Sequence, residues 1–404
     1  MGFHSQDDPK YGEASINKAL ASGRITQDDA VLIRAYAAEY QATRHVSNLR
    51  ISKSIFELVN WRRFIKSPYR EVTITQIHAA LNEQNTANTL RGKPFKQNTK
   101  HDYVKGLKWF LQWMISEGHS KLSKEKIDRI KIPAVDSCTT TPDGLLQEDD
   151  ILAIVSQART IRDKALLFML YESGCRIGEL ARIKWKDIVF NDDSTVGLAI
   201  TDTKTRKMRH AFLGASVEYL AGWRNNYPGT PDNEKFVFIT VNGEPMEYRA
   251  MSQIISRTAK KAGIEKRVTP HLFRKSKITS LIKQNYQESV IKQAMWGNLG
   301  TNMLKTYVAL GDQDIDAEFR EKMGIQKKEI KEDKKMIPRQ CKSCFAMNGP
   351  QSNFCHVCGK PLTDEAQRNV GNYSDQVQQL LADNPKAQEA FFVLMKEMKS
   401  EKTA

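Results

Sequence analysis

Two short segments, far apart in this chain, carry side chains of the types that act on a phosphodiester. One is the sequence GCRIGEL, which contains Arg176; the other begins with His271 and Arg274 and ends at Tyr307. A guanidinium stays protonated, and its planar fork fits phosphate oxygens. A tyrosine held among such cations could attack a phosphate. These residues therefore indicate cleavage of a DNA strand without a metal.

The spacing within the second segment supports this interpretation. His271 and Arg274 are three residues apart, so on a helix they share one face and can reach one phosphate. Pro270 favours a helix that starts just before them. An unperturbed tyrosine has a pKa of about 10, so Tyr307 needs nearby cations to act at neutral pH.

Four cysteines near the C-terminus have the spacing of a metal site. Cys341 and Cys344 form one CxxC pair, and Cys355 and Cys358 form a second. Four thiolates at this spacing would close a tetrahedral structural Zn²⁺ site with no open catalytic position. A redox role for the pairs is the alternative.

These segments resemble the tyrosine recombinase (phage integrase) family, and within it the archaeal integrases with a C-terminal zinc ribbon. The family motif G-x-R-x-x-E-L is present at Gly174, Arg176, Glu179 and Leu180. The resemblance implies that Arg176 binds non-bridging oxygens of the scissile phosphate and that Glu179 supports the site. It also implies that Tyr307 is the nucleophile and forms a 3′-phosphotyrosine. His271 and Arg274 match the family's H-x-x-R motif.

Two further positions come from the same resemblance. The family carries a lysine on a β-hairpin turn that protonates the departing 5′-oxygen; Lys204 aligns with it, and Lys207 is the second candidate. The family also has a histidine or tryptophan nine residues before the tyrosine. Counting back from Tyr307 gives Asn298, whereas residue type favours Trp296, so both stay candidates.

The expected fold is mainly α with a small β-sheet (α+β). The apolar periodicity and the prolines and glycines predict a helical domain at residues 12–130, a linker at 131–146 and a second domain at 147–320. A charged tether is expected at 321–339, followed by the cysteine-rich segment at 340–363 and a helical tail at 364–404. The resemblance implies that residues 12–130 are the family's helical core-binding (SAM-like) domain, that 147–320 are its catalytic domain and that 340–363 are a zinc ribbon. Strands are predicted at 195–201 and 208–213 as a hairpin, and at 236–241. Helices are predicted at 247–262, 272–283 and 288–295.

The charge balance favours a polyanionic partner. The 404 residues carry a formal net charge of +15, with a pI near 9.4. Basic residues are interleaved with the apolar residues of the first domain. They could form a DNA clamp, or they could be the ordinary solvated faces of amphipathic helices. These residues are Arg50, Lys53, Arg62, Arg63, Lys66, Lys96, Lys100 and Lys105. The sequence shows neither a membrane-length apolar run nor a secretory signal, so a cytoplasmic location is expected.

The resemblance therefore predicts a site-specific recombinase. Its expected partners are double-stranded DNA and further copies of itself, as a tetramer on paired DNA sites, with no ATP and no catalytic metal. Two alternatives remain open. One is a DNA-binding protein of the same fold with weak or lost chemistry, and the other is a type IB topoisomerase.

Overall fold

The computed structural model describes residues 10–136, 141–202, 207–323, 336–384, 386 and 388–393. Within these ranges the chain is mostly helical, with two small antiparallel sheets, as the sequence predicted. It divides into two compact units between residues 139 and 140, a position inside the predicted linker. No helix in the described ranges is long and apolar enough to cross a bilayer.

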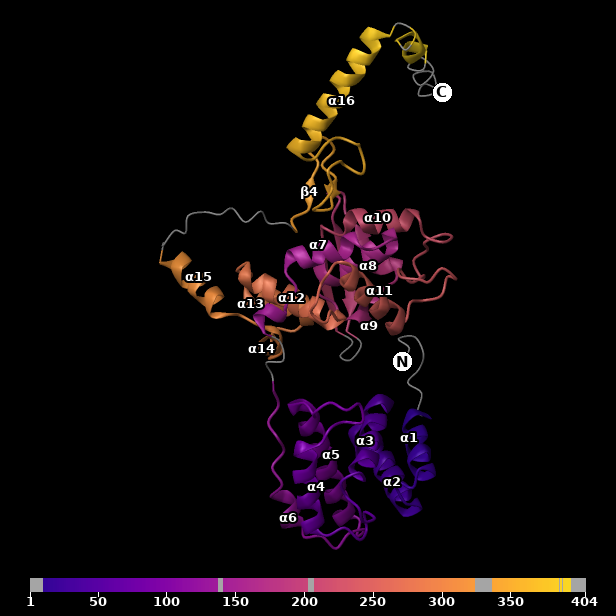
Figure 1. Ribbon diagram of the computed structural model, residues 1–404, viewed down its shortest axis with the longest axis vertical. Coiled ribbons are helices and arrows are strands. Elements are labelled where there is room, and N and C mark those ends of the chain that lie inside the picture. The colour runs from indigo at the N-terminus through magenta and orange to yellow at the C-terminus, as the bar shows by residue number, and fades with distance from the viewer. Residues whose placement is uncertain are drawn as a thin grey trace. The chain divides into compact units, whose positions relative to one another are not determined.

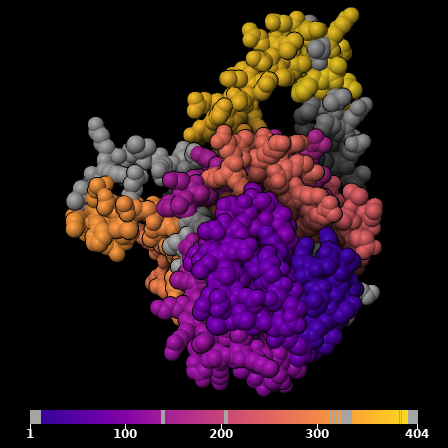
Figure 2. Space-filling view, turned by 60° about the horizontal axis from the view of Figure 1, so that its bottom comes forward, coloured from indigo at the N-terminus to yellow at the C-terminus, as the bar shows by residue number. Residues whose placement is uncertain are grey.

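The helices of the N-terminal unit are α1 (Lys10–Ala21), α2 (Gln27–Arg44), α3 (Asn48–Trp61), α4 (Ile74–Thr86), α5 (Gln97–Ser116) and α6 (Lys124–Asp128). In this unit, α1, α2 and α5 pack on α3, and α4 and α6 pack on α5 (Figure 1). Trp61, Tyr69 and Phe110 are fully buried between them. Figure 2 shows the tightly packed surface of this unit in indigo to violet.

Arg62 has a structural role in this unit. Its Nε donates to the Asp29 carboxylate at 2.9 Å, and both side chains are buried. The same carboxylate accepts the backbone N–H of Tyr69 at 2.8 Å and that of Thr26 at 3.0 Å. These contacts join the start of α2 to the end of α3. Arg62 is therefore not available to a nucleic acid, in contrast to its place in the predicted clamp.

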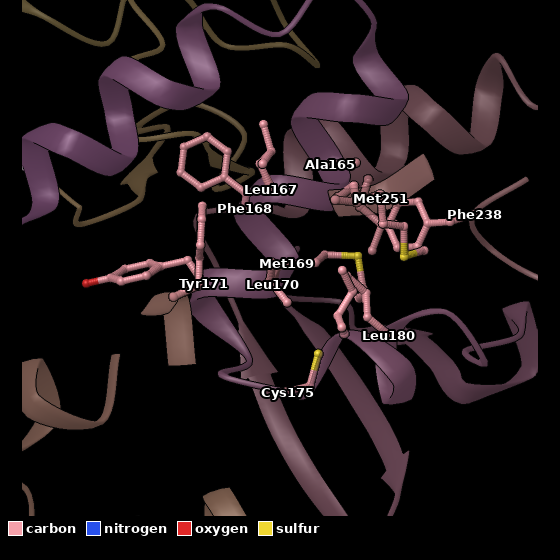
Figure 3. Packing of buried hydrophobic residues seen from close by; sticks show 14 of the residues in the cluster. Ala165, Leu167, Phe168, Met169, Leu170, Tyr171, Cys175, Leu180, Phe238 and Met251 are labelled. Carbon is pink, nitrogen blue, oxygen red and sulfur yellow. The ribbon is translucent and has the colours of Figure 1, made fainter. Parts of the chain in front are cut away.

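The second unit is centred on a buried helix. Its helices are α7 (Glu148–Ser156), α8 (Ile161–Glu172), α9 (Ile177–Leu180), α10 (Val217–Asn225), α11 (Tyr248–Lys261), α12 (Pro270–Lys283), α13 (Glu288–Trp296), α14 (Leu304–Tyr307) and α15 (Asp312–Lys322). Residues 165–170 of α8 are fully buried on every side. Figure 3 shows Met169 and Leu170 of α8 on the side of Leu180 and Met251, whereas Phe168 points the other way. The Phe168 ring stacks on that of Tyr219, with 5.0 Å between the ring centroids. This core holds the start of α9 in place.

A three-stranded antiparallel sheet lies in the same unit. Its strands are β1 (Ile188–Phe190), β2 (Val196–Thr201) and β3 (Met208–Leu213), in that order, with β2 and β3 as the predicted hairpin. The strand predicted at 236–241 is wrong, because this segment makes only isolated bridges, such as Ile239 with Pro245. Pro245 lacks the backbone N–H that a longer ladder would need.

The cysteine-rich segment is seated on α10. It contains β4 (Arg339–Gln340) and β5 (Met347–Asn348), and α16 (Asp364–Asp383) follows it. The Glu218 carboxylate of α10 accepts the backbone N–H of Gly349 at 2.8 Å and also the Ser352 hydroxyl. A Cβ at Gly349 would lie 3.1 Å from the Glu218 carboxylate, so the glycine permits this close approach.

Candidate active site and metal centre

A glycine turn sets the direction of Arg176. Gly174 follows the end of α8 with φ of +54°, and a Cβ there would lie 2.8 Å from the sulfur of Met295. Only glycine fits both requirements without strain. The turn leaves Arg176 as the residue that caps the N-terminus of α9, where its backbone N–H donates to Glu179 at 2.7 Å. The turn therefore explains why glycine occupies the first position of the G-x-R motif.

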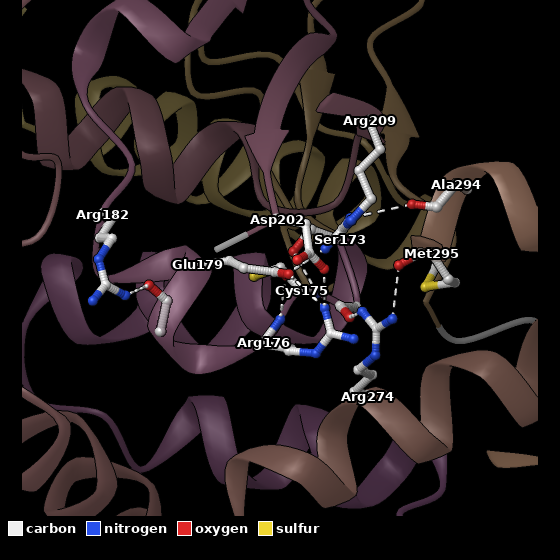
Figure 4. A network of polar contacts seen from close by, with 12 residues as sticks. Ser173, Cys175, Arg176, Glu179, Arg182, Asp202, Arg209, Arg274, Ala294 and Met295 are labelled. Carbon is white, nitrogen blue, oxygen red and sulfur yellow. Dashed lines mark hydrogen bonds and ion pairs between the residues drawn. The ribbon is translucent and has the colours of Figure 1, made fainter. Parts of the chain in front are cut away.

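The Arg176 side chain is held by two carboxylates (Figure 4). Its Nη1 donates to Glu179 Oε1 at 2.8 Å and to Asp202 Oδ2 at 2.7 Å. Burial alone lowers the pKa of Arg176, but the charge of Glu179 and its hydrogen bond raise it overall. The side chain is 36% exposed, so a ligand can reach a guanidinium that stays charged.

Arg209 completes this network, and the sequence analysis gave it no role. Its Nη2 donates to Glu179 Oε2 at 2.5 Å, and its Nη1 donates to the Ala294 carbonyl at 3.1 Å. Both Arg209 and Glu179 side chains are only 1% exposed. A signal was present, because Arg209 alternates with the buried Ala211 and Leu213 along β3 and must point inward with them.

Arg274 joins three segments of the site. It lies in the second turn of α12, which Thr269 caps by accepting the backbone N–H of Leu272 at 3.3 Å. The side chain is fully buried. Its Nη1 donates to the Gly174 carbonyl and its Nη2 to the Met295 carbonyl at 2.7 Å. Burial, and then the charge of Arg209, lower its pKa.

Tyr307 lies against His271 and Arg274. Its ring centroid is 5.1 Å from that of His271 and 5.4 Å from the guanidinium carbon of Arg274. The Thr279 hydroxyl donates to the Tyr307 carbonyl at 3.3 Å, which ties α14 to α12. Desolvation, and then the charge of Lys275, lower the pKa of His271, so its imidazole is neutral at pH 7. A negative charge on Tyr307 would act on both Arg176 and Arg274.

Trp296 and Asn298, the two candidates for one position, are in different surroundings. The Trp296 ring is buried, 5.5 Å from the Tyr307 ring at 70°, and 5.2 Å from the Arg274 guanidinium carbon. Its Nε1 is buried and has no partner among the described residues. Asn298 is exposed, and its side chain accepts the backbone N–H of Gly300. The structure therefore brings Trp296, and not Asn298, to Tyr307.

Of the two candidate lysines, Lys204 lies outside the described residues. Lys207 is exposed and directly precedes β3. The general-acid role of either lysine stays a prediction.

The four cysteines come together as the spacing predicted. Their sulfur atoms all lie within 4.8 Å of one another. The Cys341–Cys358 and Cys344–Cys355 sulfur distances are 3.6 and 3.5 Å, near the roughly 3.8 Å of a tetrahedron with metal–sulfur bonds of about 2.3 Å. Backbone N–H groups of Cys344 and Ser343 lower the pKa of Cys341 to about 6, which favours the thiolate. This cluster could hold a metal ion.

Comparison with known proteins agrees with this geometry. Residues 145–314 match the model of the phage integrase family. These residues are similar to that family. Transposase A from transposon Tn554 of Staphylococcus aureus is 29% identical over 186 residues, which cover 43% of this chain and 51% of the transposase. The tyrosine recombinase XerD of Listeria innocua is 26% identical over 229 residues, which cover 54% of this chain and 74% of XerD.

Solved structures share the fold of this chain. A lambda integrase dimer bound to a COC′ core site aligns with a TM-score of 0.55 and 18% identity, over 69% of this chain and 76% of the integrase. The XerH recombinase bound to palindromic difH substrate aligns with a TM-score of 0.53 and 15% identity, over 78% of this chain and 97% of XerH. The fold is that of the tyrosine recombinases. The match to the Tn554 transposase spans about half of its length.

Proposed function

We propose that this chain is a site-specific DNA recombinase, an integrase that cleaves and rejoins DNA through a 3′-phosphotyrosine on Tyr307. The observation that carries the proposal is that four side chains suited to this chemistry meet in one place. Arg176 precedes α9, His271 and Arg274 lie on α12, and Tyr307 ends α14. Each of the four interacts with at least one of the others in a single cluster. Two permanent cations, an imidazole and a phenol are the groups that phosphodiester transesterification requires.

The proposed reaction keeps the bond energy in a covalent link. The Tyr307 oxygen attacks phosphorus, and the bond from phosphorus to the 5′-oxygen breaks. As the tyrosine bonds to phosphorus, its phenolic proton passes to the neutral imidazole of His271, whose ring lies against that of Tyr307. A proton from Lys204 goes to the departing 5′-oxygen. A 5′-hydroxyl from another strand reverses these steps, so no ATP is consumed.

The cluster offers unused donors for the phosphate. Trp296 Nε1 and Arg274 Nε are buried without partners among the described residues. A buried donor without a partner costs about 1–3 kcal/mol, which a phosphate oxygen would recover. Arg176 is the more exposed guanidinium and would bind non-bridging oxygens. Preorganised donors of this kind stabilise the charge that develops on the pentavalent phosphorus.

We propose Zn²⁺ as the ion of the cysteine cluster, in a C-terminal zinc ribbon. Four sulfur donors in a closed tetrahedral set suit Zn²⁺, and they leave no position for a substrate. The ion would have a structural role, because the cluster belongs to a module seated on α10 and away from Tyr307 in the chain. That this chain resembles, within the family, the archaeal integrases with a C-terminal zinc ribbon stays a prediction.

The proposed partners are double-stranded DNA and further copies of this chain. The net charge of +15 supports a polyanionic partner. Strand exchange between two duplexes needs four cleavages, so four protomers on two DNA sites are proposed. A lambda integrase solved as a tetramer bound to a Holliday junction, with a TM-score of 0.52, offers a precedent in another protein. A cytoplasmic location also stays a prediction.

A trapped adduct tests the proposal. DNA that flanks the gene is prepared with a nick beside the candidate cleavage site, so that the released fragment diffuses away and the covalent complex accumulates. We expect a protein–DNA adduct on a denaturing gel with the wild-type chain and with Tyr286→Phe, a control at an exposed tyrosine. Tyr307→Phe should bind the DNA and form no adduct.

Other outcomes identify the alternatives. An adduct that persists in Tyr307→Phe would remove Tyr307 from its role. Tight binding without any adduct in the wild-type chain would indicate a DNA-binding protein that has lost the chemistry. Relaxation of supercoiled plasmid without a specific site would indicate topoisomerase activity.

A further inference from the structure

The C-terminal helix α16 exposes a narrow apolar stripe. Val370, Tyr373, Val377 and Leu380 are 46, 69, 46 and 67% exposed. Ala366 is the one buried residue among the described residues of α16. Helices in proteins owe most of their stability to the burial of an amphipathic face. An apolar stripe in water is therefore a surface that a partner would cover.

The spacing of the stripe is that of a coiled coil. Its four residues alternate by three and four positions, which are the a and d positions of successive heptads, with Val370 and Val377 at a. A helix that docks on a globular core shows a wider stripe, with apolar residues at a third position of each heptad. Here Ser374 and Gln376 flank the stripe and are polar and uncharged, and Leu381, next to Leu380, is the one apolar residue at a flanking position of α16.

The charges of α16 are arranged so that two copies can meet. The helix has four acidic residues and one basic residue: Asp364, Glu365, Arg368, Asp375 and Asp383. In the heptad register, all except Asp383 lie at the outer positions b, c and f. Pairing identical helices therefore brings few like charges together. The same acidic charge disfavours contact with the phosphates of DNA.

The local sequence makes an unpaired helix weak. Gly371 lies inside α16 at an outer position, with nothing within 4 Å of an added Cβ. A glycine in a helix interior costs about 1 kcal/mol relative to alanine. A 20-residue helix with this glycine and many polar residues is marginal alone in water. Burial of the stripe would compensate for this weakness.

We propose that α16 pairs with α16 of a second copy of this chain, as a parallel two-stranded coiled coil that forms without DNA. Valine at both a positions favours two strands over three or four in parallel coiled coils. The pairing does not depend on the recombinase chemistry. It would join two catalytic units in one particle and so raise the effective concentration of the second at a paired DNA site.

Sedimentation velocity of the full-length chain without DNA tests the pairing. We expect a reversible monomer–dimer equilibrium as the protein concentration rises. Leu380→Glu places a charge in the stripe and should raise the dimer dissociation constant roughly tenfold or more. Gln379→Glu places the same charge at the adjacent outer position and should leave the constant within about twofold of wild type. Gly371→Ala should lower it, because the helix becomes more stable.

Several results would overturn the pairing. One is a monomer at every concentration in both the wild-type chain and Gly371→Ala. A second is equal association of Leu380→Glu and wild type, which would place the contact elsewhere. A third is a wild-type monomer whose shape becomes more extended in Leu380→Glu, which would mean that the stripe binds its own chain. None of these results affects the adduct of Tyr307, so the two proposals fail separately.

Discussion

The Arg274 guanidinium has two tasks in this molecule. It donates to the carbonyls of Gly174 and Met295, and it lies beside the Tyr307 ring. The first task fixes the turn that orients Arg176, and the second places a positive charge beside Tyr307, the proposed nucleophile. A substitution of Arg274 would therefore disturb the fold of the site together with its chemistry. Tyr307 and Trp296 are better positions at which to test chemistry alone.

Substitutions can decide whether Trp296 or Asn298 is the residue that donates a hydrogen bond to the phosphate. Trp296→Phe keeps an aromatic ring against Tyr307 but removes the Nε1–H, the buried donor without a partner. We expect the single-turnover cleavage rate on nicked DNA to fall by about 10²–10³, the effect of one lost transition-state donor. Asn298→Ala, at the exposed position, should change the rate little. A large loss in Asn298→Ala with near-normal cleavage in Trp296→Phe would reverse the assignment.

The buried Arg209–Glu179 pair predicts a stability effect. Arg209→Met leaves the Glu179 carboxylate buried with one cation fewer, and breaking a buried pair costs about 3–5 kcal/mol. We expect calorimetry to show a lower unfolding temperature for the unit that contains Tyr307, and the proposed cleavage should slow because Glu179 positions Arg176. The matched control is Arg182→Met, which removes an exposed arginine and should cost less than about 0.5 kcal/mol. Equal stability of the two variants would contradict a structural role for Arg209.

At the scale of elements, the sequence predicted those whose pattern is local. The β2–β3 hairpin was predictable from two apolar strands around a polar turn, and the start of α12 from Pro270. The false strand at 236–241 had the right composition, but its partner Pro245 cannot extend a ladder. Counting back nine residues from Tyr307 reaches Asn298, but α13 ends at Trp296 and Gly297 follows in a left-handed conformation, and Asn298 is exposed. Spacing alone therefore does not decide between Trp296 and Asn298.

The cysteine module can be tested as an element. If Zn²⁺ holds the four sulfurs, one ion per chain should be present after purification, and chelation should remove it. We expect hydrogen exchange at residues 340–363 to become fast after chelation, while α8 stays protected, because the buried core of α8 does not involve the module. Cleavage in a preformed DNA complex should continue. Loss of cleavage on chelation, restored by added metal, would contradict a purely structural ion.

At the scale of the whole molecule, charge predicts how DNA binding responds to salt. Cations that contact phosphates release counterions, so affinity for duplex DNA should fall by roughly 10³–10⁵ between 50 and 200 mM salt if about 6–10 phosphates are contacted. Fluorescence anisotropy with Tyr307→Phe measures this without cleavage. Binding that hardly changes over this range would argue against extended contact of the basic chain with the DNA backbone.

The most direct measurement is the chemical identity of the DNA linkage. The trapped adduct is digested with protease and nuclease, and mass spectrometry locates the nucleotide on the protein. The account predicts a nucleotide 3′-phosphate joined to the oxygen of Tyr307, and a free 5′-hydroxyl on the released strand. A nucleotide on another residue, or a linkage through a 5′-phosphate, would contradict it.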